Sequence, residues 1–242
     1  MHAVQKFDVQ RHRRAGRSTG LAARKGNIVI HEPVAVSAHA LEAELMVPDG
    51  AHGLVMVFTD DSGGSRNNTR NQMIAQSLQR RRLGTLLLDL LMPSEAAQQD
   101  KAHDVELLTR RVLEALDWRA GRPELHDLPL GLLGAGVGAA AALLACAERP
   151  QDVDAMVSRS GRTDLAGEAL GRVLAPTLLI VGGADVEVRV MNLDAYRLLA
   201  ASEKQLEVVP RATHLFREAG ALETVAGLAG QWFVKHLAAH KS

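Results

Sequence analysis

Two residue types that cooperate in proton transfer lie late in the sequence, each just after an apolar run. Asp185 follows "APTLLIVGGA", and His214 follows "KQLEVVPRAT". A carboxylate that accepts a hydrogen bond from an imidazole orients the ring, which can then act as a general base. The spacing therefore predicts an acid and a histidine that meet after two neighbouring strands.

A glycine-rich turn lies upstream of this pair, in the stretch "GLLGAGVGAA", and is predicted to join a strand to a helix. Gly134, Gly136 and Ala139 match the G-x-G-x-x-G/A fingerprint, in which a pyrophosphate approaches a helix N-terminus. The fingerprint needs an acid at the end of the next strand, but that strand ends in Ser158 and Arg159. A Rossmann-like nucleotide-binding protein is therefore the less favoured alternative.

Short apolar runs alternate with helical segments along most of the chain. An opening hairpin is predicted from "NIVIHEPV" and "ALEAELMVP", and further strands from "GLVMVF", "LGTLLLDL", "LPLGLLG", "VDAMVS", "APTLLIVGG" and "KQLEVV". Such alternation predicts an α/β fold with a mainly parallel sheet of about eight strands and helices on both faces. We expect one domain over residues 28–242, without a large lid, because only "TDLAGEALGRVL" separates two of the later strands.

The order of strand, turn and helix, then acid, then histidine is the chain order of the triad in α/β-hydrolases. The sequence resembles the dienelactone hydrolase family, whose turn reads G-x-S-x-G and whose histidine lies in a "GATHLF"-like segment, here "RATHLF". The segments "SGGSRNNTRN" and "LGTLLLDLL" add to the resemblance. It implies an α/β-hydrolase fold and hydrolysis of esters or lactones by serine, histidine and aspartate, with no cofactor and no metal.

The nucleophile position of that motif holds Gly136 in this chain. A serine there attacks the carbonyl carbon and carries the acyl group, whereas glycine has no atom that can do so. In subtilisin, loss of the serine alone lowers turnover on the order of a million-fold. Serine hydrolysis is therefore not expected, and the remaining acid and base are Asp185 and His214.

The oxyanion-binding groups also depart from the family pattern. The resemblance assigns one donor to the backbone N–H of Val137 and places the other in the loop that contains Asp60, Asp61 and Ser62. Two carboxylates oppose a developing negative charge unless they point away, are protonated or bind a cation. Changes in both the turn and this loop favour a natural loss or change of activity.

Other side chains offer alternatives to the missing serine. Ser62, Ser158 and Ser160 carry hydroxyls near the predicted site, although such serines are more often turn or capping residues. Alternatively, the acid and histidine activate water or a ligand hydroxyl without a covalent intermediate, as in a hydrolase or lyase. The single cysteine, Cys146, falls in an Ala/Leu-rich helix and is expected to be a small core residue.

Composition limits the function classes. The 242 residues include 28 acidic and 28 basic ones, and only 3% are aromatic, so nucleic-acid binding is not expected. No apolar run reaches the roughly 20 residues of a membrane span, and the first residues lack the core of a secretory signal, which favours the cytoplasm. Residues 1–27 are basic and poor in core formers, and are predicted to be a flexible arm.

The favoured hypothesis is a hydrolase scaffold that binds a small molecule or a partner without serine chemistry. Gly136 would enlarge the floor of the pocket and relieve the backbone strain of the turn, which costs about 1–3 kcal/mol for other residues. Whether any enzymatic activity remains, and whether the protein forms a homo-oligomer, are left open by the sequence.

Overall fold

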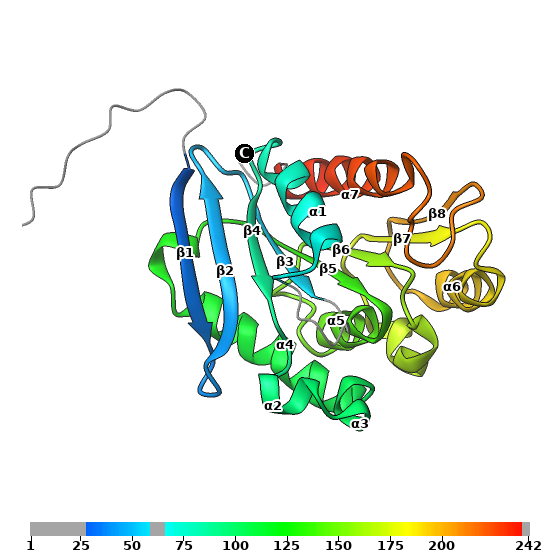
Figure 1. Ribbon diagram of the computed structural model, residues 1–242, viewed down its shortest axis with the longest axis horizontal. Helices are drawn as coiled ribbons and strands as arrows, with labels where there is room; N and C mark the ends of the chain where they lie inside the picture. The colour runs from blue at the N-terminus through cyan, green and yellow to red at the C-terminus, as the bar shows by residue number, and fades with distance from the viewer. Residues whose placement is uncertain (1–27, 59–65, 239–242) are drawn as a thin grey trace, which may run out of the picture.

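The computed structural model describes residues 28–58 and 66–238, and the predicted basic arm at residues 1–27 lies outside them. This part of the chain forms an eight-stranded sheet in the order β1-β2-β4-β3-β5-β6-β7-β8, with helices on both faces (Figure 1). The strands are β1 (Ile28–Val36), β2 (Leu41–Pro48), β3 (Leu54–Phe58), β4 (Gly84–Leu88), β5 (Leu130–Ala135), β6 (Ala155–Arg159), β7 (Thr177–Gly182) and β8 (Lys204–Val209). The predicted fold class is confirmed.

The first two strands form the predicted antiparallel hairpin. Strand β2 alternates buried and more exposed residues, as expected of a sheet edge with one face in the core. Strand β1 tolerates Pro33 because it pairs only with β2 and so needs fewer backbone donors. This hairpin precedes β3, and the strand order differs from the 3-2-1-4-5-6 order of a Rossmann sheet, which counts against the nucleotide-binding alternative.

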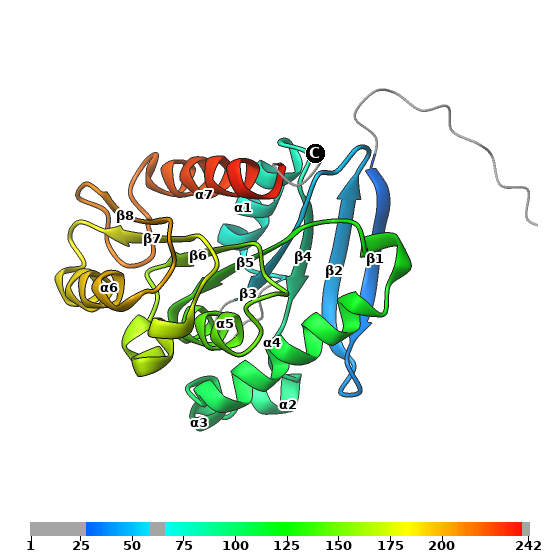
Figure 2. The same cartoon turned by 180° about the vertical axis from the view of Figure 1, so that it is seen from behind.

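From β3 to β8 the neighbouring strands run parallel, and β3 to β7 are buried along their length. Such strands need cover on both sides, which explains their continuous apolar character. Helices α1 (Thr69–Gln79) and α7 (Ala221–Leu237) cover one face, and α4 (Val105–Ala120), α5 (Gly136–Glu148) and α6 (Val186–Leu198) cover the other (Figures 1 and 2). Two apolar cores result, one on each side of the sheet.

Short elements fill the remaining connections. Helices α2 (Pro93–Ala96) and α3 (Gln99–Ala102) lie between β4 and α4, and the 3-10 turn η1 (Pro123–Leu125) precedes β5. The segment between β6 and β7, where a lid was not expected, forms the 3-10 turns η2 (Thr163–Arg172). Its buried residues pack against the core on the α5 side of the sheet.

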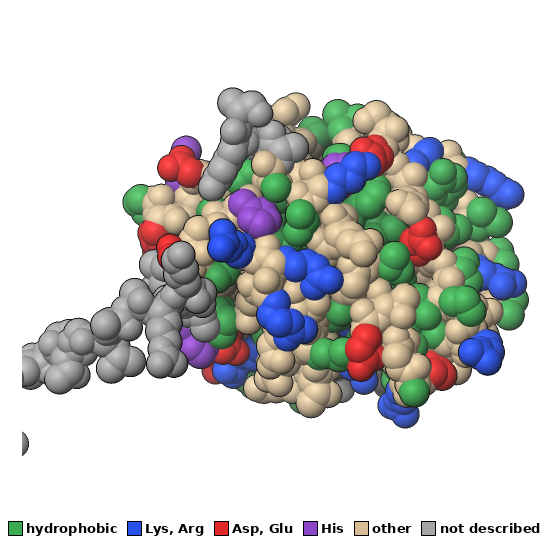
Figure 3. Space-filling model, turned by 90° about the horizontal axis from the view of Figure 1, so that it is seen from above, with side chains coloured by type: hydrophobic (Ala, Val, Ile, Leu, Met, Phe, Trp, Pro, Cys, Tyr) green, Lys and Arg blue, Asp and Glu red, His purple; other side chains and the backbone are tan. Residues whose placement is uncertain are grey.

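Charges of both signs are spread over the molecular face in Figure 3, between apolar and polar side chains. This distribution agrees with the formal net charge of zero. Among the residues that the structure describes, we find no helix with both the length and the apolarity needed to cross a membrane.

Candidate functional site

The glycine-rich turn lies at the carboxyl end of β5, near the middle of the sheet. Strand β5 ends at Ala135, and α5 begins at the next residue, Gly136, whose φ is +54°. The turn is tight because β5 and the first turn of α5 lie very close together. A Cβ on Gly134 would lie 2.5 Å from the Cα of Ala139, so only glycine fits there.

The predicted acid and base lie side by side at the same edge of the sheet. Asp185 immediately precedes α6, and His214 lies in the loop between β8 and α7. Nδ1 of His214 donates a hydrogen bond to Oδ2 of Asp185 over 2.7 Å. The carboxylate is 15% exposed and the imidazole 48% exposed, so the acid is shielded while the ring remains accessible.

Backbone contacts hold the His214 loop against the turn after β7. The N–H of Ala184 donates to the carbonyl of Ala212 over 2.9 Å. Gly182 permits this approach, because a Cβ there would lie 2.4 Å from the same carbonyl oxygen. Beside His214, the hydroxyl of Thr213 donates to Glu218 over 2.7 Å, and this hydrogen bond helps to hold the pKa of Glu218 below its usual value.

Gly136 and His214 share a small hollow, which we call the Gly136 hollow. Its volume is about 30 Å³, comparable to the space that one water molecule occupies in the liquid. The described residues that line it are Arg70, Ala135, Gly136, Arg159, Ser160, His214 and Leu215. Two guanidinium groups and an imidazole therefore surround a turn that carries no side chain at its first helical residue.

Arg159 is the most deeply buried charged residue of the Gly136 hollow. It ends β6 and lies directly beside Ala135 in the parallel register, which places it next to the glycine-rich turn. It is 5% exposed, and its Nη2 donates to Oδ1 of Asn71 on α1 over 3.2 Å. A buried arginine at the floor of a hollow favours an anionic group nearby.

Ser160 follows Arg159 and also lines the hollow. Its φ is +43°, a value unusual for serine, and its buried hydroxyl has no hydrogen-bond partner among the described residues. Several hydrogen bonds hold the turn around it in place, among them the bond of 2.8 Å from the N–H of Ser160 to the carbonyl of Ile180. Nδ2 of Asn192 donates to the carbonyl of Gly161, and the N–H of Arg162 donates to the carbonyl of Gly136, each over 2.9 Å.

The sequence and the fold resemble those of a solved bacterial protein. A dienelactone hydrolase from Anabaena variabilis is 44% identical, with 88% of this chain and 99% of that chain covered and a TM-score of 0.81. The chain belongs to the dienelactone hydrolase family. A second solved structure is a dienelactone hydrolase-like promiscuous phosphotriesterase from metagenomic libraries, with 20% sequence identity and a TM-score of 0.68. The match covers 86% of this chain and 98% of that chain, and at this identity it supports the fold alone.

Two curated proteins from Mycobacterium tuberculosis strains are similar in sequence to this chain. Each is 46% identical over 209 residues, which are 86% of this chain and 46% of the relative, and each is provisionally named a phosphoribosyl transferase. The chain thus spans about half the length of these relatives. No protein-family model matches the chain.

The predicted oxyanion groups of the family are only partly described. Val137 lies in the first turn of α5, where it is buried. Asp60, Asp61 and Ser62 lie outside the described residues, so their placement stays a prediction. Within the described residues, no group of three or more His, Cys, Asp and Glu side chains is arranged to hold a metal ion.

The single cysteine lies outside the Gly136 hollow. Cys146 is fully buried on α5 as predicted, and burial raises the pKa of its thiol to about 12. A thiol of this kind stays protonated at neutral pH and is a poor nucleophile.

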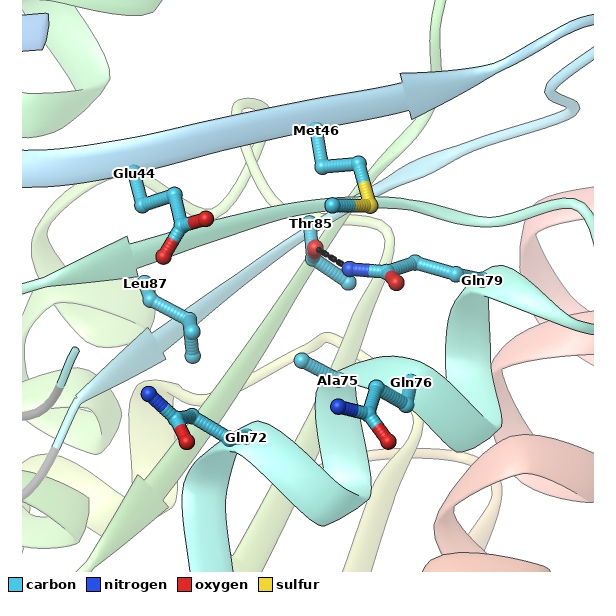
Figure 4. A pocket seen from close by; sticks show the side chains of 8 residues that line it. All are labelled: Glu44, Met46, Gln72, Ala75, Gln76, Gln79, Thr85 and Leu87. Carbon is cyan, nitrogen blue, oxygen red and sulfur yellow. Dashed lines mark hydrogen bonds between the residues drawn. The ribbon is translucent and has the colours of Figure 1, made fainter. Parts of the chain in front are cut away.

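A larger hollow of about 200 Å³ lies between α1 and the strands β2 and β4 (Figure 4). Its residues are Glu44, Met46, Gln72, Ala75, Gln76, Gln79, Thr85 and Leu87, and Nε2 of Gln79 donates to the hydroxyl of Thr85 over 2.7 Å. The amides and the single carboxylate do not form a nucleophile with an adjacent base. Although it is larger, we assign the candidate site of this dienelactone hydrolase family member to the Gly136 hollow, which is lined by two arginines and by His214, the partner of Asp185.

Proposed function

We propose that this member of the dienelactone hydrolase family binds a small molecule in the Gly136 hollow and lacks serine-hydrolase activity. The observation that carries the proposal is the glycine itself. Gly136 has the left-handed φ of a sharp strand-to-helix turn and lines the hollow, yet it has no side chain to attack a carbonyl. In the family motif G-x-S-x-G this position belongs to the nucleophile, and without it no acyl-enzyme forms.

The surroundings of the hollow support binding. The lining combines charged, polar and apolar groups, and the half-exposed His214 leaves one side open to a ligand. The names of the Mycobacterium tuberculosis relatives apply to proteins about twice as long as the matched segment. We therefore base the proposal on the residues of the hollow and not on those names.

The hydrogen bond between Asp185 and His214 favours one second candidate function. A carboxylate 2.7 Å from Nδ1 orients the imidazole, so that the other ring nitrogen can accept a proton from water or a ligand hydroxyl. This candidate is an enzyme of the hydrolase or lyase type that forms no covalent intermediate. It shares the hollow with the binding function and differs in whether the ligand is chemically changed.

A fluorophosphonate probe and a panel of small esters and lactones test the proposal on the purified full chain. We expect neither covalent labelling nor turnover above the uncatalysed rate. Labelling of the wild-type protein at any serine would overturn the proposal. Turnover without labelling that is lost in His214→Gln would instead support the second candidate.

A further inference from the structure

We infer that the outward face of α6 is an interface, on which a second copy of this chain docks with its own α6 running antiparallel. The inference goes beyond the proposed function, because it does not depend on the chemistry of the Gly136 hollow. Two features of α6 carry it: an exposed apolar stripe, and charges that complement one another across a two-fold axis.

The exposed apolar side chains of the described residues are gathered in one part of the chain. All of the large ones lie between η2 and β8, and they are Leu165, Leu174, Val186, Val190, Leu193, Leu198 and Val208. Four of these seven belong to α6, which lies at one end of the molecule, away from the β1-β2 hairpin (Figures 1 and 2). Apolar surface that is gathered in this way marks an interaction site, whereas single scattered apolar residues do not.

Three of these residues form a line along the helix, which we call the α6 stripe. Val186, Val190 and Leu193 are 57%, 53% and 40% exposed, and their spacing of i, i+4 and i+7 places them on one face. Val188 and Ala195 are buried on the face toward the sheet. The helix is therefore apolar on both its inner and its outer face, which is expected of a helix that packs between two layers.

Charged residues flank the α6 stripe near both ends of the helix. Glu187 is exposed in the first turn, and Arg197 is exposed in the last turn, one turn beyond Leu193. Arg197 pairs with Asp194 over 2.9 Å, and Asp194 lies seven residues after Glu187, which is the same side of a helix. One flank of the stripe therefore carries an acid at the start of α6 and a base at its end.

This arrangement is complementary to a second copy of itself. In an antiparallel pair with the two-fold axis between residues 191 and 192, Val190 lies opposite Leu193 of the second copy. The same symmetry keeps equal flanks together. It brings Glu187 of each copy within one residue, about 1.5 Å along the helix, of the level of Arg197 in the other. Each half of the pair thus contributes the same apolar contact and the same ion pair.

The contacts that these charges make within one copy do not prevent such a pairing. The charge of Glu187 acts on Arg162, but the guanidinium of Arg162 donates two hydrogen bonds to Asp164, over 2.9 and 2.8 Å. The pair of Arg197 with Asp194 is exposed, and exposed ion pairs contribute little to stability. Arg197 can therefore turn toward Glu187 of a second copy at little cost.

The expected contact area is modest. A helix of 13 residues is about 20 Å long, so its face supplies only part of the roughly 800 Å² that each partner buries in a standard interface. Segment η2 lies beside α6, because the hydroxyl of Thr163 donates to the carbonyl of Met191 over 3.3 Å, and its exposed Leu165 adds apolar surface. We therefore expect a dimer with a dissociation constant in the micromolar range.

Sedimentation velocity of the full-length protein, from nanomolar to high micromolar concentration, tests the inference. We expect the average mass to rise from that of one chain and to level at that of two, because a two-fold contact closes on itself. A wild-type protein that stays monomeric over the whole range, or whose mass grows beyond two chains, would overturn the proposed interface.

Val190→Glu tests the centre of the α6 stripe. A carboxylate opposite Leu193 of the second copy should weaken association at least tenfold, because it would lose water without gaining a partner. The fold should be kept, since the position is exposed and glutamate favours helix, and circular dichroism checks this. Gln231→Glu is the control, because it adds the same charge at an exposed position of α7 and should associate as the wild type does.

A charge exchange tests the antiparallel pairing. Glu187→Arg and Arg197→Glu should each weaken association several-fold, because each places like charges opposite one another at both ends of the pair. The double variant should regain most of the lost affinity, since opposite charges then face each other again. Wild-type affinity in Val190→Glu, or a double variant no tighter than the single ones, would overturn the inference. Fluorophosphonate labelling bears on the proposed function alone, so the two proposals fail separately.

Discussion

Gly136 occupies a backbone conformation that glycine adopts without strain and that other residues adopt at a cost of about 1–3 kcal/mol. Its φ of +54° places the chain in a sharp turn between β5 and α5. The same conformation that exposes a serine hydroxyl in a hydrolase is thus present here without the hydroxyl. We propose that Gly136 keeps the shape of the turn but lacks the hydroxyl that would attack a substrate.

The buried Cys146 yields a prediction at this scale. Because its pKa is raised to about 12 and its side chain is buried, the thiol should react with an aromatic disulfide reagent only when the protein unfolds. The measurement compares reaction rates in buffer and in denaturant. Rapid reaction of the folded protein would contradict this prediction, and Cys146→Ala provides the blank.

Single residues of the site were unequally predictable from the sequence. Asp185 and His214 follow two apolar runs, and parallel strands bring such positions to one edge of a sheet. The sequence marks Arg159 only as a residue that is not an acid, and it favours a turn or capping role for Ser160. Their place beside Gly136 depends on the register of β5 with β6, for which the sequence offered one sign, an arginine at the end of an apolar strand.

The connections after β7 and β8 determine how the acid and the base meet. Gly182→Ala should destabilise the protein by about 1–3 kcal/mol, because the new Cβ would meet the carbonyl oxygen of Ala212 at 2.4 Å. Moving that carbonyl would also displace the loop that carries His214. Urea denaturation measures the loss of stability, and the shift of the His214 ring signals in NMR reports the loop.

Gly227→Ala is the matched control for this prediction. Gly227 lies inside α7, and an added Cβ there meets no atom within 4 Å. The substitution should be neutral or stabilising by up to about 1 kcal/mol, since alanine favours helix more than glycine does. Equal destabilisation by both variants would show that the packing between the two loops is not the cause.

Elements were more predictable than single contacts. Each apolar run that was expected to be a strand is one, and the amphipathic segment "DVELLTRRVLEALDW" forms most of α4, whose N-cap Asp104 accepts from the N–H of Leu107. Buried strands and amphipathic helices leave a periodic pattern in the sequence. The short helices α2 and α3 were not predicted, because four residues are too few for such a pattern. The ten-residue η2 turns were not predicted either, because 3-10 turns lack the 3.6-residue period of an α-helix.

His236, near the end of α7, links the stability of the whole molecule to pH. Its ring packs against that of Trp232, with the two ring centroids 4.5 Å apart. Burial lowers the pKa of His236, although the negative charge of Glu203 opposes this effect. Below its unfolded pKa of about 6.5 the unfolded chain binds this proton more readily than the folded one. Stability should therefore fall as pH drops from about 6.5 toward the lower folded pKa.

Urea denaturation between pH 7.5 and 5 measures this dependence in the wild type and in His236→Gln. The variant should lose part of the slope. His126→Gln, at a residue whose side chain is 74% exposed, should keep the wild-type slope. A slope that is the same in all three proteins would contradict the assignment to His236.

At the scale of the molecule, the chain has the sheet and the layers of the dienelactone hydrolase family. Sequence pattern alone predicted this architecture. Most of the chain consists of strands buried on both faces and of the helices that cover them, and both leave a clear pattern in the sequence. The ligand was not predictable, since it depends on a hollow lined from four separate segments of the chain. The arm at residues 1–27 and the acidic loop at Asp60 and Asp61 stay predictions.

Fluorophosphonate labelling of the wild type and of Gly136→Ser, read by intact mass, tests the central claim most directly. We predict no adduct on the wild-type protein. On the variant we predict slow formation of a single adduct, because the new hydroxyl joins Asp185 and His214 while the oxyanion loop keeps its acids. An adduct on any serine of the wild-type protein would contradict the account.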